Sequence, residues 1–251
     1  MTDPVFLVPD LADQLERVGE VGQFTLPAAE AKHAAVKRIR TGEQVVLTDG
    51  YGRGVSAAFG TADTVTGSGV LPARSPRPRV TVVQAIPKSE RSELAVDLAV
   101  QAGADRIIPW QSDRCIAKWD GKPGKAEKAR AKWEAAAVSA MKQSRRLDGA
   151  HVGDLLTDID DLADLLADRP WAEPVDSVLI LVLHEEAATP LAQLDLDVDE
   201  IVLVIGPEGG VSPREVEAGQ PVVLGPEVYR TASAAAVALG AIGVLTSRWA
   251  R

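Results

Sequence analysis

A run of apolar residues that leads into a glycine turn constrains this fold more than any other stretch of the chain. Residues 201–205 read Ile-Val-Leu-Val-Ile, which is typical of a strand buried on both faces of a helix-covered parallel sheet. Residues 206–210 read Gly-Pro-Glu-Gly-Gly and turn the chain sharply. Ser212 and Glu215 then form a capping-box pattern around Pro213. The sequence therefore predicts a strand, a glycine turn and a helix in succession.

A second turn of the same kind follows directly. Residues 222–224 read as a short strand, residues 225–230 as a loop, and an alanine-rich helix is expected from Thr231 to about Trp249. Open α/β sheets bind their ligands at the carboxyl ends of such strands. A single Gly-Pro or Gly-Gly turn is more often an ordinary connection. Two in succession favour a shared ligand site.

Composition bounds the class of protein. The chain has 251 residues, 46% of them hydrophobic and 25% charged, as in soluble globular proteins of one or two domains. It has no apolar run of about 18 residues and no basic region of a signal peptide. We therefore expect a cytoplasmic protein with no membrane partner. The single cysteine, Cys115, excludes an internal disulfide, and the three histidines lack metal-ligand spacing, so no metal is expected.

The net charge of −9 hides a strong asymmetry along the chain. Residues 74–146 carry 16 Lys or Arg against 8 Asp or Glu, whereas residues 147–251 carry 5 against 19. A basic middle third can be the electrostatic footprint for a polyanion. The alternative is a solvated helix face, and charge alone does not decide between them.

The domain organisation follows from composition shifts. Residues 1–73 show short strands with glycine turns, including a hairpin at 45–59, and predict a small β-barrel that serves as a binding module. Residues 74–79 are a proline-rich linker. Residues 80–251 alternate strands with helices, which predicts an α/β domain with a parallel sheet and helices on both faces. Its expected strands are 80–86, 106–110 and 177–183, and its expected helices are 89–102, 125–144 and 158–168.

Two polar clusters lie at element ends of this domain, at residues 87–91 and 142–146. Loops and element ends are where function concentrates. A basic helix end also complements the helix dipole, so Arg145 and Arg146 have a structural interpretation as well.

Several motifs occur together in one order. They are Pro87-Lys88-x-x-Arg91, Ile107-Ile108-Pro109 with Ser112-Asp113-Arg114, Gln143-Ser144-x-Arg146, Ile205-Gly206-Pro207-Glu208-Gly209-Gly210, and Leu224-Gly225-x-x-x-x-Arg230-Thr231. This series resembles the RsmE-type family, the uridine N3-methyltransferases of small-subunit ribosomal RNA in the SPOUT class. The likeness spans nearly the whole chain, since residues 33–42 also resemble the N-terminal pattern of the family.

The resemblance implies a fold, an activity and partners. The fold is a PUA-like RNA-binding β-barrel followed by a SPOUT methyltransferase domain whose parallel sheet holds a trefoil knot. The activity is S-adenosylmethionine-dependent methylation of N3 of a uridine in 16S ribosomal RNA. The partners are that RNA, free or in the assembled small subunit, and a second copy of the chain in a homodimer.

The resemblance also assigns residues. Cofactor-binding residues are expected in three loops: Leu183, His184, Gly206, Pro207, Glu208, Gly209, Gly210, Leu224, Gly225, Val228, Tyr229, Arg230 and Ala232. RNA-binding residues are expected to be Lys37, Arg38, Arg40, Lys88, Arg91, Gln143, Arg145 and Arg146. Side-chain substitution at Gly206 or Gly225 is expected to abolish cofactor binding by steric exclusion.

Catalysis requires loss of the uracil N3 proton and stabilisation of the resulting anion. We assign Glu208 to base contact or proton handling, and Arg91, Arg146 and Arg230 to phosphate or developing negative charge. Glu208 has an alternative, which is to cap the amides of its own turn. His184 is expected to pack its loop rather than to act as a base.

Some positions depart from the family pattern. Lys142 stands where the family usually has glutamate, and Ala232-Ser233 where it usually has Glu-Thr. Small residues in the last helix favour either a dimer interface or packing within the chain. Trp110, Trp119 and Trp133 either stack on bases or anchor a core.

Three other functions are alternatives. The first is a SPOUT enzyme that acts on another RNA, such as a tRNA, and the second is a non-catalytic RNA-binding or ribosome-assembly factor. The third is a nucleotide-binding Rossmann enzyme, but this chain lacks the glycine fingerprint of that class.

Overall fold

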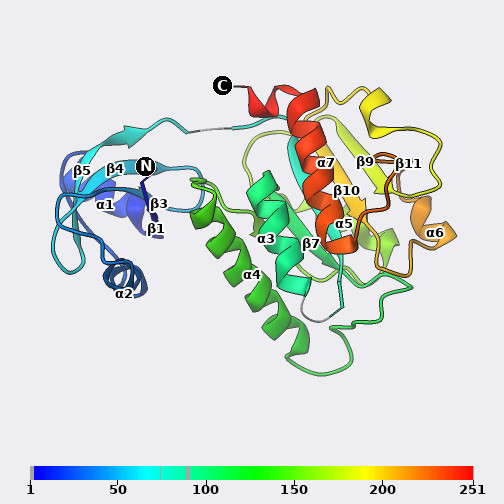
Figure 1. Ribbon diagram of the computed structural model, residues 1–251, viewed down its shortest axis with the longest axis horizontal. Coiled ribbons are helices and arrows are strands. Elements are labelled where there is room, and N and C mark those ends of the chain that lie inside the picture. The colour runs from blue at the N-terminus through cyan, green and yellow to red at the C-terminus, as the bar shows by residue number, and fades with distance from the viewer. Residues whose placement is uncertain (1–2, 74, 89–90, 251) are drawn as a thin grey trace. The chain divides into compact units, whose positions relative to one another are not determined.

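The structure is a computed structural model that describes residues 3–73, 75–88 and 91–250. The chain forms two compact units (Figure 1). The first comprises Met1–Ser75 and Met141–Gly149, and the second comprises Pro76–Ala140 and Ala150–Arg251. Two expectations fall partly outside the described residues, namely the linker at position 74 and the helix start at position 89. No described helix is both long and apolar enough to cross a membrane.

The first unit is a curled five-stranded sheet with two helices. Its elements are β1 (Val5–Leu7), α1 (Leu11–Val18), β2 (Gln23–Thr25), α2 (Ala28–Val36), β3 (Gln44–Thr48), β4 (Gly54–Phe59) and β5 (Thr64–Leu71). The strand order is β1-β3-β4-β5-β2. β1 and β3 are parallel, and the other pairs are antiparallel. The β3–β4 hairpin lies where the sequence predicted it, and Asp49 Oδ1 accepts the amides of Tyr51 and Arg53 in its turn.

Helix α1 was not predicted, although Leu11, Leu15 and Val18 recur at helical spacing and could have identified it. Leu11 is fully buried in the core of this unit beside Phe6, Phe24 and Leu47. The Gln14 side chain bonds both backbone groups of Thr25, donating from Nε2 to the carbonyl and accepting the amide at Oε1 (3.0 and 2.8 Å). The Gln14 side chain therefore bonds the backbone of β2 as a neighbouring strand would, and it joins helix α1 to that strand.

The end of helix α4 (Lys125–Gln143) supplies an ion pair to the first unit. Lys142 Nζ lies 2.7 Å from both carboxylate oxygens of Glu30 and 3.1 Å from His33 Nδ1. The Lys142 and Glu30 side chains are only 13% and 12% exposed. Burial, and then the positive charges of Lys142 and Lys37, lower the pKa of His33. Lys142, a departure from the family pattern, thus pairs with an acidic residue of α2.

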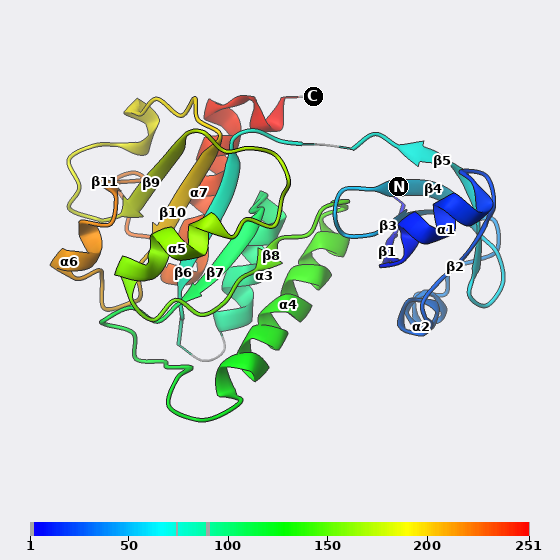
Figure 2. The same cartoon turned by 180° about the vertical axis from the view of Figure 1, so that it is seen from behind.

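The second unit is a six-stranded, fully parallel sheet with the order β11-β9-β10-β6-β7-β8 (Figure 2). Its strands are β6 (Arg79–Ala85), β7 (Arg106–Trp110), β8 (His151–Val152), β9 (Val178–Leu183), β10 (Glu200–Ile205) and β11 (Gln220–Val222). Every residue of β10 is buried, as its apolar sequence predicted. β11 begins two residues earlier than expected. It is an edge strand, where Pro221 is tolerated, and Val223 bonds Thr189 and Leu191 instead of continuing along β9.

Helices cover both faces of this sheet. α3 (Ser92–Ala102) and α7 (Thr231–Leu245) pack together on one face, and α5 (Leu162–Ala167) lies on the other (Figures 1 and 2). α7 ends four residues before the expected position, and a 3-10 turn (Ser247–Trp249) follows it. The Trp249 ring folds back onto Gly243, where an added Cβ would lie 2.4 Å from it. Packing within the chain therefore explains the glycine at position 243.

The tryptophans act as core residues. Trp110, Trp119 and Trp133 are all buried. The rings of Trp119 and Trp133 meet edge to face at 4.9 Å, and Trp133 Nε1 donates to Ser92 Oγ at 2.7 Å. None of the three is therefore available to stack on a base in this structure.

The Lys142 ion pair generates a prediction about stability. Lys142→Met keeps the apolar stem but leaves the largely buried Glu30 carboxylate without this partner. We expect the free energy of unfolding to fall by about 1–3 kcal/mol, measured by urea denaturation. The pKa of His33, followed by NMR, should rise because one of the charges that lowers it is removed.

Lys132→Met is the matched control on the same helix, because Lys132 is exposed. It should change stability by no more than about 0.5 kcal/mol. Equal losses in the two variants would show that the ion pair contributes nothing.

Candidate active site

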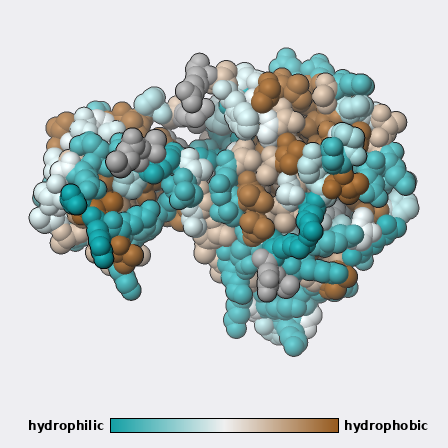
Figure 3. All heavy atoms as spheres, in the orientation of Figure 1, coloured by the Kyte–Doolittle hydropathy of each residue, from teal (hydrophilic) through white to brown (hydrophobic). Residues whose placement is uncertain are grey.

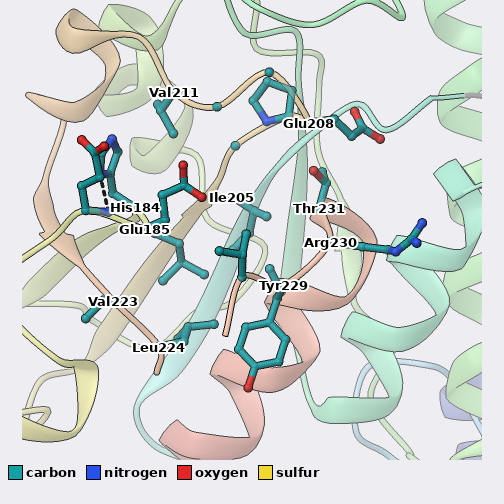
Figure 4. A pocket seen from close by; sticks show the side chains of 18 of the residues that line it. His184, Glu185, Ile205, Glu208, Val211, Val223, Leu224, Tyr229, Arg230 and Thr231 are labelled. Atoms are coloured by element: carbon teal, nitrogen blue, oxygen red, sulfur yellow. Dashed lines mark hydrogen bonds between the residues drawn. The ribbon is translucent and has the colours of Figure 1, made fainter. Parts of the chain in front are cut away.

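Three loops at the carboxyl ends of β9, β10 and β11 line one cavity of about 660 Å³ (Figure 4). This volume lies within the range of roughly 300–1,000 Å³ that is usual for small-molecule sites. The floor is apolar, with Ile205 from β10 and Val223 and Leu224 after β11. All the lining residues belong to the second unit. The two glycine-bearing turns therefore converge on one site, as the sequence predicted.

The loop after β10 is shaped by its glycines. A Cβ added at Gly206 would lie 2.7 Å from Cγ2 of Val211, a buried and stiff side chain. Gly210 has φ +75°, a conformation that side chains disfavour, and its amide donates to the Pro207 carbonyl at 3.0 Å. The expected capping box is present, with the Ser212 amide 2.7 Å from Glu215 Oε2. The loop thus exposes backbone to the cavity and is held at its far end.

The other two loops are joined by backbone bonds. The His184 amide donates to the Val222 carbonyl at 2.9 Å, and His184 Nδ1 accepts the Glu186 amide at 3.2 Å. These contacts favour the loop-packing role for His184. Arg230 is the N-cap of α7, and Ser233 bonds back to its carbonyl.

Most of the expected cofactor residues surround the cavity. Those that line it are Leu183, His184, Gly206, Pro207, Glu208, Gly209, Gly210, Leu224, Val228, Tyr229 and Arg230. Gly225 and Ala232 are not among the lining residues. Among protein atoms, an added Cβ at Gly225 would meet the Glu227 carboxylate at 3.9 Å, so the free protein has room for it and exclusion of a bound cofactor stays a prediction.

Charges of both signs line the cavity. Arg91, Arg114 and Arg230 are exposed, and within the described part of the chain no carboxylate forms an ion pair with them. Three glutamates, at positions 185, 186 and 227, also line the site. Figure 4 shows Glu185 on the opposite side of the cavity from Arg230. The site can therefore accept one group that carries positive charge and another that carries negative charge.

Glu208 projects away from the cavity floor, on the same side as Arg230 (Figure 4). Its Oε1 accepts the amide of Lys88 at 3.4 Å, from the loop between β6 and α3. The bond joins two separate loops, unlike the capping of its own turn that the sequence also allowed.

The expected RNA-binding residues divide between the two units. Lys88 and Arg91 belong to the second unit, and the others belong to the first: Lys37, Arg38, Arg40, Gln143, Arg145 and Arg146. Arg146 forms an ion pair with Asp148 at 3.1 Å, also within the first unit. Arg146 is not among the residues that line the cavity, and its expected catalytic role stays a prediction.

Several lining residues were missed from the sequence, notably Arg114 and the three glutamates. Arg114 stands in one of the motifs that carry the resemblance, but no role was attached to it. Glu185 and Glu186 directly follow an expected strand, so their place at its carboxyl end could have identified them. Across the described ranges, no group of three or more His, Cys, Asp or Glu side chains could hold a metal ion.

Comparisons with known proteins show the family to which the chain is similar. A family model described as an RNA methyltransferase domain matches residues 73–243. The ribosomal RNA small subunit methyltransferase E of Mycobacterium tuberculosis is 46% identical over 235 residues, which cover 88% of this chain and 86% of the relative. The protein of the same name from Bacillus subtilis is 25% identical, with 92% and 93% of the two chains covered.

A solved structure supports the fold. The ribosomal RNA small subunit methyltransferase E of Neisseria gonorrhoeae, bound to S-adenosyl methionine, gives a TM-score of 0.81 at 24% identity, with 97% and 98% of the chains covered. The expected fold class, a SPOUT-type parallel sheet with helices on both faces preceded by a small β-barrel domain, is confirmed, with the curled five-stranded sheet in the place of the barrel. The chain belongs to the family of RNA methyltransferases, and within it to the ribosomal RNA small subunit methyltransferases E.

Proposed function

We propose that this protein transfers a methyl group from S-adenosylmethionine to N3 of a uridine in the 16S ribosomal RNA of the small subunit. The observation that carries the proposal is the single cavity formed by three loops at the carboxyl rim of the sheet. The names of the relatives support a small-subunit RNA over a tRNA. The Neisseria structure, which holds S-adenosyl methionine in the same fold, supports the choice of methyl donor.

The residues present fit this donor. Gly206 leaves a space at the backbone that a Cβ could fill only by displacing Val211. Apolar side chains of Ile205, Val223 and Leu224 can cover an adenine ring, and the backbone groups of the glycine loop can bond its edge. When bound, the donor supplies an electrophilic methyl group on a positively charged sulfur.

The negatively charged glutamates of the cavity complement the positive charge of the donor. Glu185, Glu186 and Glu227 line the site and, within the described residues, form no ion pair with a cation. A carboxylate near a sulfonium or ammonium group favours binding by Coulomb attraction in a partly enclosed site. We assign these side chains to recognition of the positively charged part of the donor.

On the acceptor side, the chain must remove the N3 proton and hold the resulting negative charge. Arg91 and Arg230 are the N-cap residues of α3 and α7, and neither uses its side chain to cap its helix. A helix N-terminus and an adjacent guanidinium both favour an anion. We assign Arg91 and Arg230 to the deprotonated base or its phosphate, and a Glu208 carboxylate oxygen to the proton.

The first unit is proposed to bind RNA. Lys37, Arg38 and Arg40 are exposed at and after the end of α2, and Arg145 is exposed in the segment 141–149 of the same unit. Such cations position an RNA backbone without reading its sequence. We assign this unit as the PUA-like RNA-binding domain, and a cytoplasmic location follows from a ribosomal substrate.

A homodimer is also proposed, through the outer surface of α7. Hydrophobic side chains gather over this helix and its surroundings (Figure 3). Val237, Val244, Leu245 and Trp249 are 36–73% exposed there. An apolar patch of this kind on a soluble protein marks an association surface.

Mass spectrometry of 16S RNA from cells that lack this protein tests the proposed function. We expect loss of one N3-methyluridine, and its return when purified protein and S-adenosylmethionine are added to the unmethylated small subunits. An unchanged set of methylated uridines would refute the assignment.

Glu208→Gln tests the proton acceptor. Glutamine retains an oxygen that can accept the Lys88 amide but cannot take a proton at neutral pH. We expect kcat to fall by about 10²-fold, with the affinity for S-adenosylmethionine unchanged in calorimetry. A kcat equal to that of the wild-type protein would remove Glu208 from the chemistry.

Gly206→Ala tests the shape of the cavity. The added methyl group must displace Val211, so we expect the affinity for S-adenosylmethionine to fall by at least about tenfold, because the displaced side chain distorts the site. Gly225→Ala is the matched control, since its Cβ meets nothing closer than 3.9 Å. Both variants could lose affinity equally. The glycine at position 225 would then be explained by contact with the bound donor, because the free protein has room for a Cβ there.

A further inference from the structure

Two arginines near the glycine loop, Arg114 and Arg214, differ in whether a carboxylate pairs with them. Arg214 is the paired one. Its Nε and Nη2 donate to the two carboxylate oxygens of Asp113 at 3.0 and 2.8 Å. Its Nη1 donates to Asp158 at 2.8 Å, and Asp160 lies 3.7 Å away. These bonds raise the pKa of Arg214 above its usual value. Its N–H donors and its positive charge therefore stabilise the fold through these carboxylates.

Arg114 keeps its charge available. It lines the cavity and is exposed, and its Nη1 donates to the Gly209 carbonyl at 3.3 Å. Among the described residues no carboxylate lies within ion-pair distance of it. A guanidinium has five N–H donors, so most of them remain free for a ligand at this corner of the cavity.

The loop that carries Arg114 is held firmly. The Asp113 amide donates to Glu215 Oε1 at 2.7 Å, and Glu215 is only 1% exposed. Asp113 also accepts from Ser212 Oγ at 2.7 Å. The bonds from Arg214 and Ser212 lower the pKa of Asp113 to about 2, so the carboxylate is ionised at any pH at which the enzyme would work. This brace fixes the backbone beside Arg114 and ties it to the glycine loop.

We infer that Arg114 binds a phosphate of the RNA substrate where the Gly209–Gly210 backbone meets the mouth of the cavity. The inference rests on the proposed function. A guanidinium that no carboxylate neutralises can donate two parallel N–H bonds to a phosphate, and the braced loop holds it at the mouth of the cavity. Arg91 and Arg230 line the same cavity, and three cations around one opening suit the repeated phosphates of a nucleic acid.

The methyl donor is the other possible source of an oxyanion, since it carries one carboxylate. That carboxylate is accompanied by an ammonium group and a sulfonium, so the donor as a whole is a cation. It therefore complements the glutamates of the cavity better than three arginines. RNA is accordingly the ligand that we assign to Arg114.

Arg114→Ala, Arg114→Lys and the control Lys132→Ala test the assignment in methyl transfer to unmethylated small ribosomal subunits. For Arg114→Ala we expect the KM for the subunits to rise about tenfold, because a charge-assisted contact is lost, with the affinity for S-adenosylmethionine unchanged. The slope of log KM against log salt should also become shallower by about 0.7–0.9, the value for one phosphate contact. Arg114→Lys should restore the slope, and Lys132→Ala should match the wild-type protein.

Two outcomes would overturn the inference. One is a wild-type KM and salt slope in Arg114→Ala. The other is a loss of S-adenosylmethionine affinity without a change in the KM for the subunits, which would assign Arg114 to the carboxylate of the donor. Failure of the proposed function is distinguishable, because the wild-type protein itself would then transfer no methyl group to the subunits.

Discussion

Burial of β10 in the middle of the parallel sheet is the constraint on which the rest of the second unit depends. Each of its six residues is buried, with β9 on one side and β6 on the other. Because all the strands are parallel, their carboxyl ends share one rim, and the loops after β9, β10 and β11 meet there. The glycine loop after β10 lies at the centre of that rim. The cavity is thus a consequence of strand order and loop shape together.

Local pattern predicted the elements whose stability is local. The apolar run of β10, the capping box at Ser212 and the β3–β4 hairpin are all read from adjacent residues, and all are present. Elements that depend on distant partners were missed or misplaced. β11 stops at Val222 because Val223 pairs with Thr189 and Leu191, which lie outside any local window of the sequence. Helix α1 was missed for another reason, since Leu11, Leu15 and Val18 recur at helical spacing and were not read as a helix.

The charge asymmetry of the sequence reappears inside the cavity. Arg91 and Arg114 come from the basic middle third of the chain, whereas Glu185, Glu186 and Glu227 come from the acidic last third. A net charge of −9 would argue against a nucleic-acid partner if it were spread evenly. The fold instead brings both signs to one site, where a cationic donor and an anionic RNA must meet.

Residue type alone could not have separated the roles of the cations. Asp113, Arg114 and Arg214 are all charged, yet the fold pairs Asp113 with Arg214, which is 101 positions away. Its sequence neighbour Arg114 forms no ion pair with any described carboxylate. Arg146 differs from Arg114, because its guanidinium forms an ion pair with Asp148 within the first unit. Resemblance to a family shows which residues occur in which order along the chain. The ion pairs of the folded chain decide which charges remain for a ligand. Because Asp113 pairs with Arg214, the charge of Arg114 remains for a ligand of the cavity.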